Sequence, residues 1–156
     1  MSGGKEAFLR ELKSRTRSEL VEDSSALGEL RTQLDSYFRH KRRSFEIPLD
    51  LRGTSFQVDV WKGIYEVPYG ELTSYGRIAK AIGKPKAVRA VGNAVGDNPI
   101  SLVVPCHRVV SSDGGIGGFG GGLPLKRKML AHEGVLENAE GVPERNVDLR
   151  QFFHRK

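Results

Sequence analysis

The chain holds a single cysteine, Cys106, among its 156 residues. One thiol can form neither an internal disulfide nor a zinc site with several cysteine ligands, so the fold must be stabilised by a hydrophobic core. At this length we expect one domain with a real core and room for a small appendage. The thiol is either buried packing material, because free cysteine is among the most buried residue types, or a reagent.

The neighbours of Cys106 bear on this choice. Residues 100–104 have the composition of a short buried strand, and Pro105 ends it because proline cannot donate to a sheet ladder. Cys106 then stands at the mouth of a strand, with His107 directly after it. A nearby imidazole helps a thiol become the nucleophilic thiolate. The spacing by itself leaves both interpretations open.

Composition narrows the setting. No stretch approaches the roughly 20 apolar residues of a membrane span, and residues 1–6 lack the apolar core of a signal peptide. Together with the unpaired thiol, these features predict an intracellular protein. The formal net charge of +6 suggests a polyanionic partner, most simply nucleic acid.

The pattern of the chain predicts three regions: residues 1–48, 49–136 and 137–156. Residues 1–24 are charge-rich and weakly periodic, so we expect loose order there, and the polar tail from 137 onward should fray. Residues 23–25 form a capping cluster before a helix with apolar residues at helical spacing, namely Leu27, Leu30, Leu34, Tyr37 and Phe38. We expect this helix to cover an apolar face and to be dispensable for chemistry.

The basic run at residues 39–43 ends this helix. It is either a solvated helix end favoured by the macrodipole or a contact for phosphate.

Three helices are predicted between residues 54 and 96. Thr54 and Gln57 form a capping box at the start of the first. Ser74 caps a second, which Gly83 ends. The third spans about residues 86–95, ends at Gly96, and should turn three valines inward: Val88, Val91 and Val95. Two short helices across a glycine-containing turn resemble a helix-turn-helix, although a generic helical hairpin shares this pattern.

Residues 114–122 are rich in glycine. They match the dinucleotide fingerprint only formally, because no βαβ unit surrounds them. A flexible linker is one alternative, and a pocket wall lined by backbone, where glycine permits close approach, is the one we favour. Pro124 then opens a helix that ends near Gly134.

In this order, the features resemble the O6-alkylguanine-DNA alkyltransferases, also called methylated-DNA–protein-cysteine methyltransferases. The likeness covers residues 49–135 and rests on segments 68–76, 89–99, 105–109 and 130–134. It implies a mainly α fold with a helix-turn-helix, winged-helix-like domain, a short active-site strand, and an N-terminal β domain that is reduced or missing.

The resemblance also implies the activity. The family flips O6-alkylguanine out of double-stranded DNA and transfers the alkyl group irreversibly to its own cysteine, once and without cofactor or metal. We therefore expect a monomer that acts on the chromosome, in the nucleus of a eukaryote or the nucleoid of a prokaryote.

Family roles carry over onto matching positions. Cys106 is implied to be the nucleophile, His107 to draw its proton through a water, and Glu133 to orient the imidazole. Tyr75 is implied to protonate the base or help the nucleotide rotate, and Arg89 to fill the gap that base flipping leaves. The implied substrate contacts are Tyr75, Asn98, Val109, Phe119, Gly120 and Lys126, and the implied DNA contacts are Tyr75, Lys86, Arg89 and Asn93.

Some positions depart from the family or leave a choice. Phe119 stands where many members have a tyrosine, and Gly120 replaces a serine whose backbone N–H glycine retains. His132 is a competing base, and we interpret Arg108 as a structural ion-pair partner. Three other functions fit the sequence less well. A lesion-binding relative that performs no chemistry would lack Cys106, and the catalytic histidine of a cysteine hydrolase is rarely adjacent to its cysteine. A plain helix-turn-helix regulator would not need the motif at residues 105–108.

Overall fold

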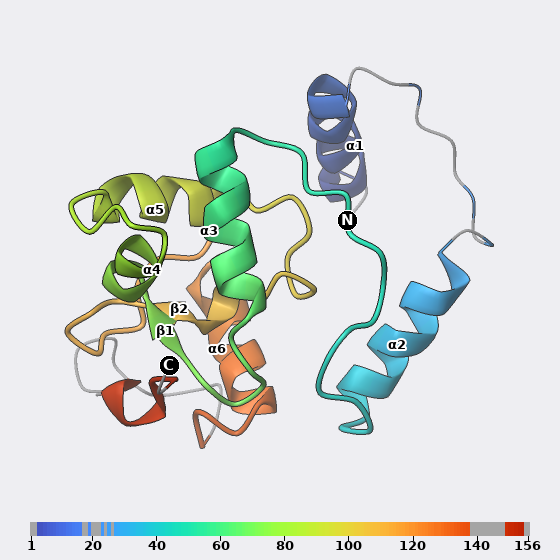
Figure 1. Ribbon diagram of the computed structural model, residues 1–156. Coiled ribbons are helices and arrows are strands. Elements are labelled where there is room, and N and C mark those ends of the chain that lie inside the picture. The colour runs from blue at the N-terminus through green and yellow to red at the C-terminus, as the bar shows by residue number, and fades with distance from the viewer. Residues whose placement is uncertain are drawn as a thin grey trace.

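The computed structural model describes residues 3–16, 19, 23, 25, 27–137 and 149–154. Its elements in chain order are α1 (Gly3–Thr16), α2 (Gly28–Phe38), α3 (Ser55–Tyr65), β1 (Thr73–Ser74), α4 (Tyr75–Ala81), α5 (Val88–Gly96), the 3-10 helix η1 (Cys106–Arg108), β2 (Val109–Val110), α6 (Leu123–His132) and the 3-10 helix η2 (Leu149–Phe152). The two short strands pair in parallel, Thr73 opposite Val109. The described part is mainly helical, as predicted (Figure 1).

Helices α3, α4 and α5 pack on one another around one apolar core, and the helix-turn-helix pair is α4 and α5. The predicted capping box is present: Gln57 N–H donates to Thr54 Oγ1, and Thr54 N–H donates to the Gln57 side chain. Gly83 ends the α4 region with a φ of +71°, a left-handed conformation that favours glycine. These local signals predicted the helices correctly.

One inward valine was predicted wrongly. Val91 and Val95 of α5 are buried, but Val88 is 40% exposed. Val88 is the first residue of α5, so no preceding helical turn shields it.

Residues 100–104 do not form the predicted strand. Leu102 has a φ of 78°, and Val104 N–H donates to the Ile100 carbonyl at 3.0 Å, so the chain makes a tight turn. The Asn98 side chain holds this turn: Nδ2 donates to the Val104 carbonyl at 2.7 Å, and Oδ1 accepts from Ile100 N–H at 3.1 Å. The strand instead follows the cysteine, at β2, and Cys106 begins η1.

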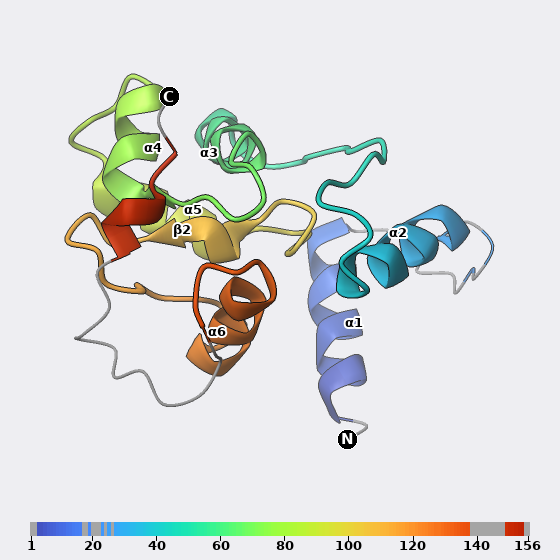
Figure 2. The same ribbon diagram turned by 90° about the horizontal axis from the view of Figure 1, so that it is seen from below.

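The N-terminal region is more helical than predicted. Residues 3–16 form α1, because alanine, leucine, lysine and glutamate favour a helix even where the apolar periodicity is weak. The predicted capping cluster is also wrong, since α2 begins after Leu27 without a side-chain cap. Helix α2 covers an apolar face through Leu30, Leu34 and Tyr37, and Tyr37 joins Phe45, Val103 and Met129 in one core cluster. Two members of the predicted stripe do not take part, since Leu27 is 59% and Phe38 52% exposed. Both helices lie on the side away from α4 and α5 (Figure 2).

The described end of the chain is ordered rather than frayed. Leu149 is buried, and Leu72 exchanges two backbone hydrogen bonds of 2.7 Å with Phe152 and His154. The Arg77 guanidinium lies over the Phe153 ring, 4.7 Å from its centroid. Apolar residues of the tail complete a second core cluster with Leu72, Val110 and Leu130. The 3-10 helix η2 lies beside α4 (Figure 2). Residues 138–148, which fall in the same predicted tail, lie outside the described residues.

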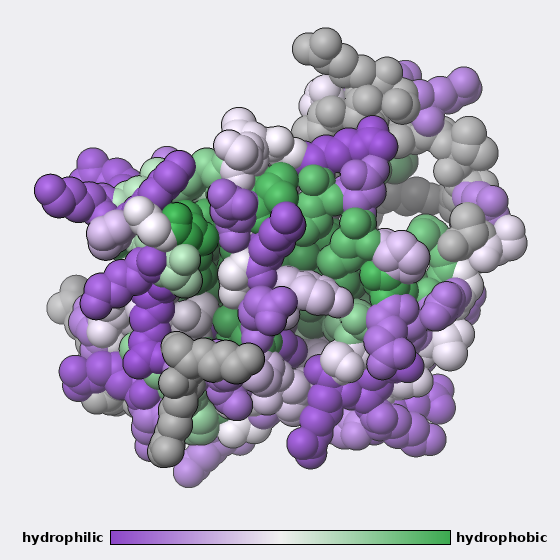
Figure 3. All heavy atoms as spheres, viewed as in Figure 1, coloured by the Kyte–Doolittle hydropathy of each residue, from purple (hydrophilic) through white to green (hydrophobic). Residues whose placement is uncertain are grey.

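The surface divides by polarity. Apolar side chains gather between α3 and the N-terminal helices, whereas hydrophilic side chains crowd the edge over α4 and α5 (Figure 3). That edge carries exposed Lys80, Lys84, Lys86 and Arg89. Among the described helices, none has the length and apolar character that crossing a membrane requires.

Candidate functional site

Cys106 lies inside the molecule, at the junction of three elements. It is only 4% exposed and belongs to the core shared by α3, α4 and α5. Its backbone N–H donates to the Val104 carbonyl at 2.8 Å, and its thiol donates to Ser101 Oγ at 3.8 Å. The turn held by Asn98 therefore fixes the position of the sulfur.

His107, which follows Cys106 in the chain, forms a buried pair with Glu133. His107 Nε2 lies 2.9 Å from Glu133 Oε1, and the two residues are 1% and 5% exposed. Burial raises the pKa of Glu133, but hydrogen bonds from His107 and Arg108 lower it to about 2. The carboxylate is thus ionised at neutral pH and can only accept hydrogen bonds. His107 must carry its proton on Nε2, which leaves Nδ1 as a free acceptor whenever the ring is neutral.

The imidazole is held in its neutral, basic form. Burial lowers the pKa of His107, while the hydrogen bond and charge of Glu133 oppose that effect. A neutral ring with Nδ1 unprotonated has the state that a proton acceptor for a thiol needs.

Arg108 is the structural ion-pair partner predicted from the sequence. Its Nε and Nη2 donate to the Glu133 carboxylate at distances from 2.8 to 3.2 Å, and its Nη1 donates to the Val67 carbonyl at 2.6 Å. The Gly70 N–H donates to Glu133 Oε2 at 3.2 Å. Glu133 therefore joins the end of α6 to η1 and to the turn after α3.

Sequence reasoning missed one member of this network, Tyr37. Its side chain is fully buried, and its hydroxyl donates to Glu133 Oε1 at 2.7 Å across 96 positions of the chain. The sequence placed Tyr37 on an apolar helix face and assigned that helix no part in the chemistry. A signal was present, because a tyrosine in an inward stripe of leucines must find a polar partner for its hydroxyl.

Tyr75 and the glycine-rich loop lie against each other. Tyr75 is the first residue of α4, and its hydroxyl donates to the Gly118 carbonyl at 3.3 Å. Burial raises the pKa of Tyr75, the Gly118 bond lowers it, and nearby Cys106 raises it, with a net rise. Gly117 has a φ of +69°, and a Cβ there would lie 3.2 Å from the Tyr75 ring and hydroxyl. Only glycine lets the loop approach this closely.

Lys126 is fully buried beneath this loop. Its Nζ donates to the Val109 carbonyl at 2.6 Å and to the Gly118 carbonyl at 3.0 Å. Burial lowers the pKa of Lys126 to about 8, while Cys106 raises it. The structure thus brings Lys126, Val109, Tyr75 and the loop close to the thiol. Phe119 is half-buried against the same core, and Gly120 is exposed.

The residues implied to contact DNA lie on the surface. Lys86, Arg89 and Asn93 are all exposed, and the last two are four residues apart on the outer face of α5. The structure does not bring them into the buried network.

His132 and the basic run at residues 39–43 make contacts that hold the N-terminal region to the rest of the protein. His132 Nε2 lies 3.0 Å from the Tyr37 carbonyl, and its ring stacks on His40. Arg42 pairs with Glu46 at 3.6 Å, and Arg43 lies over the Tyr69 ring. These contacts give His132 and part of the run a structural role.

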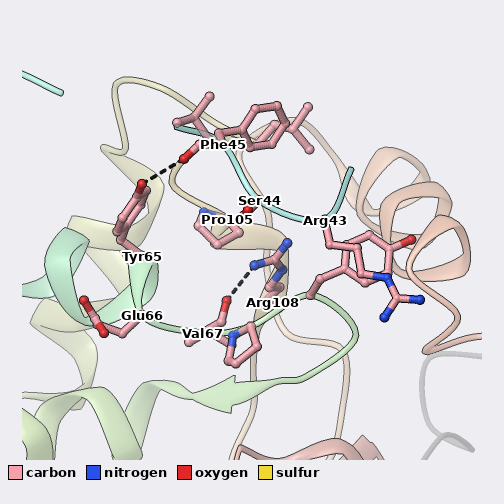
Figure 4. A pocket seen from close by; sticks show the side chains of 12 residues that line it. Arg43, Ser44, Phe45, Tyr65, Glu66, Val67, Pro105 and Arg108 are labelled. Carbon is pink, nitrogen blue, oxygen red and sulfur yellow. Dashed lines mark hydrogen bonds between the residues drawn. The ribbon is translucent and has the colours of Figure 1, made fainter. Parts of the chain in front are cut away.

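A cavity of about 430 Å³ borders the network on the side of Pro105 and Arg108. Figure 4 shows the Arg108 guanidinium directed at the Val67 carbonyl, and the Tyr65 hydroxyl bonded to the Phe45 carbonyl at 3.1 Å. Arg43 to Phe45 form its outer wall. Neither Cys106 nor Tyr75 lines this cavity. Within the described residues, no cluster of three or more metal-ligating side chains occurs.

Comparisons with known proteins agree with the geometry. Residues 55–135 match the DNA-binding domain of 6-O-methylguanine DNA methyltransferase, and residues 2–51 match the ribonuclease-like domain of the same family. A Mycobacterium bovis methylated-DNA–protein-cysteine methyltransferase is 48% identical over 118 residues, which are 76% of this chain and 72% of that protein.

Solved structures give the same result. The Mycobacterium tuberculosis OGT in complex with DNA matches with a TM-score of 0.73 and 47% identity, over 76% of this chain and 73% of that one. Schizosaccharomyces pombe Atl1, in complex with damaged DNA containing O6-carboxymethylguanine, matches with a TM-score of 0.55 and 29% identity, over 68% of this chain and 100% of that one.

A helical DNA-binding domain with a single buried cysteine beside a histidine–carboxylate pair defines a class of cysteine-dependent DNA-acting proteins. Within that class, the chain belongs to the 6-O-methylguanine DNA methyltransferase family. The resemblance drawn from the sequence is confirmed. The expectation of a reduced or missing N-terminal domain is not, because the family's ribonuclease-like domain matches residues 2–51, although described residues 3–16 and 27–54 contain no strand.

Proposed function

We propose that this protein repairs O6-alkylguanine in double-stranded DNA by transferring the alkyl group to Cys106. The observation that carries the proposal is the buried pair of His107 and Glu133, 2.9 Å apart, in which His107 directly follows the only cysteine. Family membership supports the reaction class. The proposed protein is a stoichiometric transferase that acts as a monomer on chromosomal DNA inside the cell.

The chemistry follows from the protonation states. Cys106 gives its thiol proton to Nδ1 of His107, through a bridging water, and the charge of Glu133 stabilises the imidazolium that forms. The thiolate attacks the alkyl carbon, so a carbon–sulfur bond forms as the carbon–O6 bond breaks. Tyr75, whose pKa is raised, keeps its proton and can donate a hydrogen bond to the departing guanine, which takes up the thiol proton from the His107 imidazolium through water. The thioether is stable, which makes the transfer irreversible.

Other residues bind the substrate. Asn98 fixes the turn that carries the sulfur, and Val109, Phe119, Gly120 and Lys126 surround the alkylated base. Lys86, Arg89 and Asn93 contact DNA from α5, and Arg89 occupies the gap left by the flipped base, since extrusion costs a few kcal/mol. We place the boundary between the N-terminal region and this domain at residues 48 and 49, and the C-terminal tail from residue 137.

The test is the intact mass of the protein after incubation with a duplex containing O6-methylguanine. The wild type should gain one methyl group permanently, and Cys106→Ser should gain none while its DNA affinity stays within a few-fold. Unmodified guanine in the same duplex is the control. Transfer that survives in Cys106→Ser, or a wild type that binds the lesion and gains no mass, would refute the proposal; the second outcome would indicate a lesion-binding protein.

A further inference from the structure

Helix α2 supplies a buried hydroxyl to the carboxylate of Glu133. Tyr37 OH lies 2.7 Å from Oε1, the same oxygen that His107 Nε2 approaches to 2.9 Å. Arg108 Nη2 lies 2.8 Å from that oxygen. A carboxylate oxygen offers about two lone-pair positions, so these three donors share its charge.

We propose that Tyr37 is a positioning residue for alkyl transfer: its hydroxyl holds the Glu133 carboxylate in register with His107 and limits how strongly that carboxylate attracts the imidazolium. The inference rests on the proposed function and assigns a part in it to the N-terminal region. Sequence reasoning had expected that region to be dispensable for chemistry.

The donor in this contact is well defined. Burial and the neighbouring Glu133 charge raise the pKa of Tyr37 far above its usual range, so the phenol keeps its proton and Glu133 must be the acceptor. The ring is fully buried and packs against Phe45, Tyr69 and His132, which leaves the hydroxyl little freedom.

The charged and titratable groups around the site fix the sign of the effect. Those that act on Glu133 or His107 are Tyr37, Tyr69, Arg108 and Lys126. Cys106 acts on Lys126, and the His132 ring packs against the Tyr37 ring. Apart from His107 itself, Tyr37 is the neutral side-chain donor to Oε1 among the described residues, whereas Arg108 is a cation. Without the Tyr37 hydroxyl, the cations stay in place and the negative charge on Oε1 interacts more strongly with His107. The pKa of His107 should therefore rise.

The test compares Tyr37→Phe with Tyr69→Phe. Phenylalanine keeps the ring and removes one hydroxyl in each case, but Tyr69 OH donates at 2.8 Å to the backbone carbonyl of His132 rather than to Glu133. Two readouts are measured: the pKa of the His107 ring by NMR, and the single-turnover rate of transfer from a free benzylguanine-type base against pH.

Tyr37→Phe should raise the pKa of His107 by about one unit, move the acid limb of the rate profile to higher pH by the same amount, and slow the plateau by about 10-fold. Tyr69→Phe should change neither the pKa nor the limb. Equal behaviour of the two variants, or a fall in the pKa of His107, would overturn the proposal.

A second measurement covers a Tyr37→Phe protein that fails to fold. Fluorotyrosine at position 37 keeps the hydroxyl and makes it a stronger donor, so the pKa of His107 should fall below the wild-type value; no change, or a rise, would contradict the proposal. The NMR readout needs no DNA. If the pKa of His107 shifts as expected but the wild type never becomes methylated at Cys106, the proposed function is refuted and the coupling between Tyr37 and His107 still holds.

Discussion

Glutamine at position 133 would keep the shape of the side chain and remove its charge. In the wild type, the carboxylate accepts hydrogen bonds from Tyr37, Gly70, His107 and Arg108. The Arg108 side chain is only 7% exposed, so the variant leaves a buried cation without its counter-ion. Removing one partner of such a pair costs about 3–5 kcal/mol, and we expect the free energy of unfolding to fall by this amount at neutral pH.

The pH dependence supplies an independent magnitude. The pKa of Glu133 is lowered from 4.5 to about 2. At about 1.4 kcal/mol for each unit, that shift corresponds to about 3 kcal/mol. Because the pKa is depressed in the folded state, this stability is fully present above pH 4.5 and is lost as the pH falls toward 2. The glutamine variant has no such carboxyl, so the difference between the two proteins should narrow by about 3 kcal/mol across this interval.

Urea unfolding at several pH values measures both quantities. Trp61 is the only tryptophan, it is buried, and its Nε1–H donates to the Ala94 carbonyl at 2.7 Å, so its fluorescence reports loss of the core. Glu66→Gln, at an exposed position, is the control and should stay within about 0.5 kcal/mol of the wild type. A Glu133→Gln effect below about 1 kcal/mol at neutral pH, or one that does not vary with pH, would refute the assignment of a buried, ionised carboxylate.

Two further substitutions test the DNA surface and the buried lysine. Arg89→Ala should slow repair of methylated duplex far more than transfer from a free benzylguanine-type base, because a free base needs no extrusion; equal defects in single-turnover rate would remove the role of Arg89 in base flipping. Between pH 8 and 10.5 the buried Lys126 has lost its proton while the lysine of the unfolded chain still holds it, so the free energy of unfolding of the wild type should rise by up to about 3 kcal/mol. Lys126→Met has no such group and should not show this rise. Urea unfolding across this pH interval measures the difference, and parallel plots of the free energy of unfolding against pH for the two proteins would contradict the lowered pKa of Lys126.

Local signals in the sequence predicted local structure well. The capping box at Thr54 and Gln57, the left-handed Gly83 and the proline at the start of α6 each act within a few residues of themselves. Their outcome depends little on the rest of the fold. The cysteine and its histidine were found for the same reason, since they are adjacent in the chain.

Features that depend on distant contacts were predicted less well. Apolar composition suggested a strand at residues 100–104, but the side chain of Asn98 provides hydrogen bonds that a ladder would otherwise supply. The tail was expected to fray because it is polar. The order of its described residues comes from backbone hydrogen bonds with Leu72, far away in the sequence, and the tail's own composition does not indicate them. The helix of Tyr37 indicates that its hydroxyl needs a polar partner, but it does not identify Glu133, which becomes that partner only when α2 and the end of α6 come together.

The span of that contact has a consequence for folding. Helices α3, α4 and α5 follow one another closely in the chain, and contacts between near neighbours form early because they close short loops. The Tyr37–Glu133 bond closes a loop of 96 residues, which has a larger entropic cost and forms late. We therefore expect a folding chain to acquire its DNA-binding surface before its buried carboxylate network is complete. A partly folded molecule would then hold DNA while its cysteine is still inert.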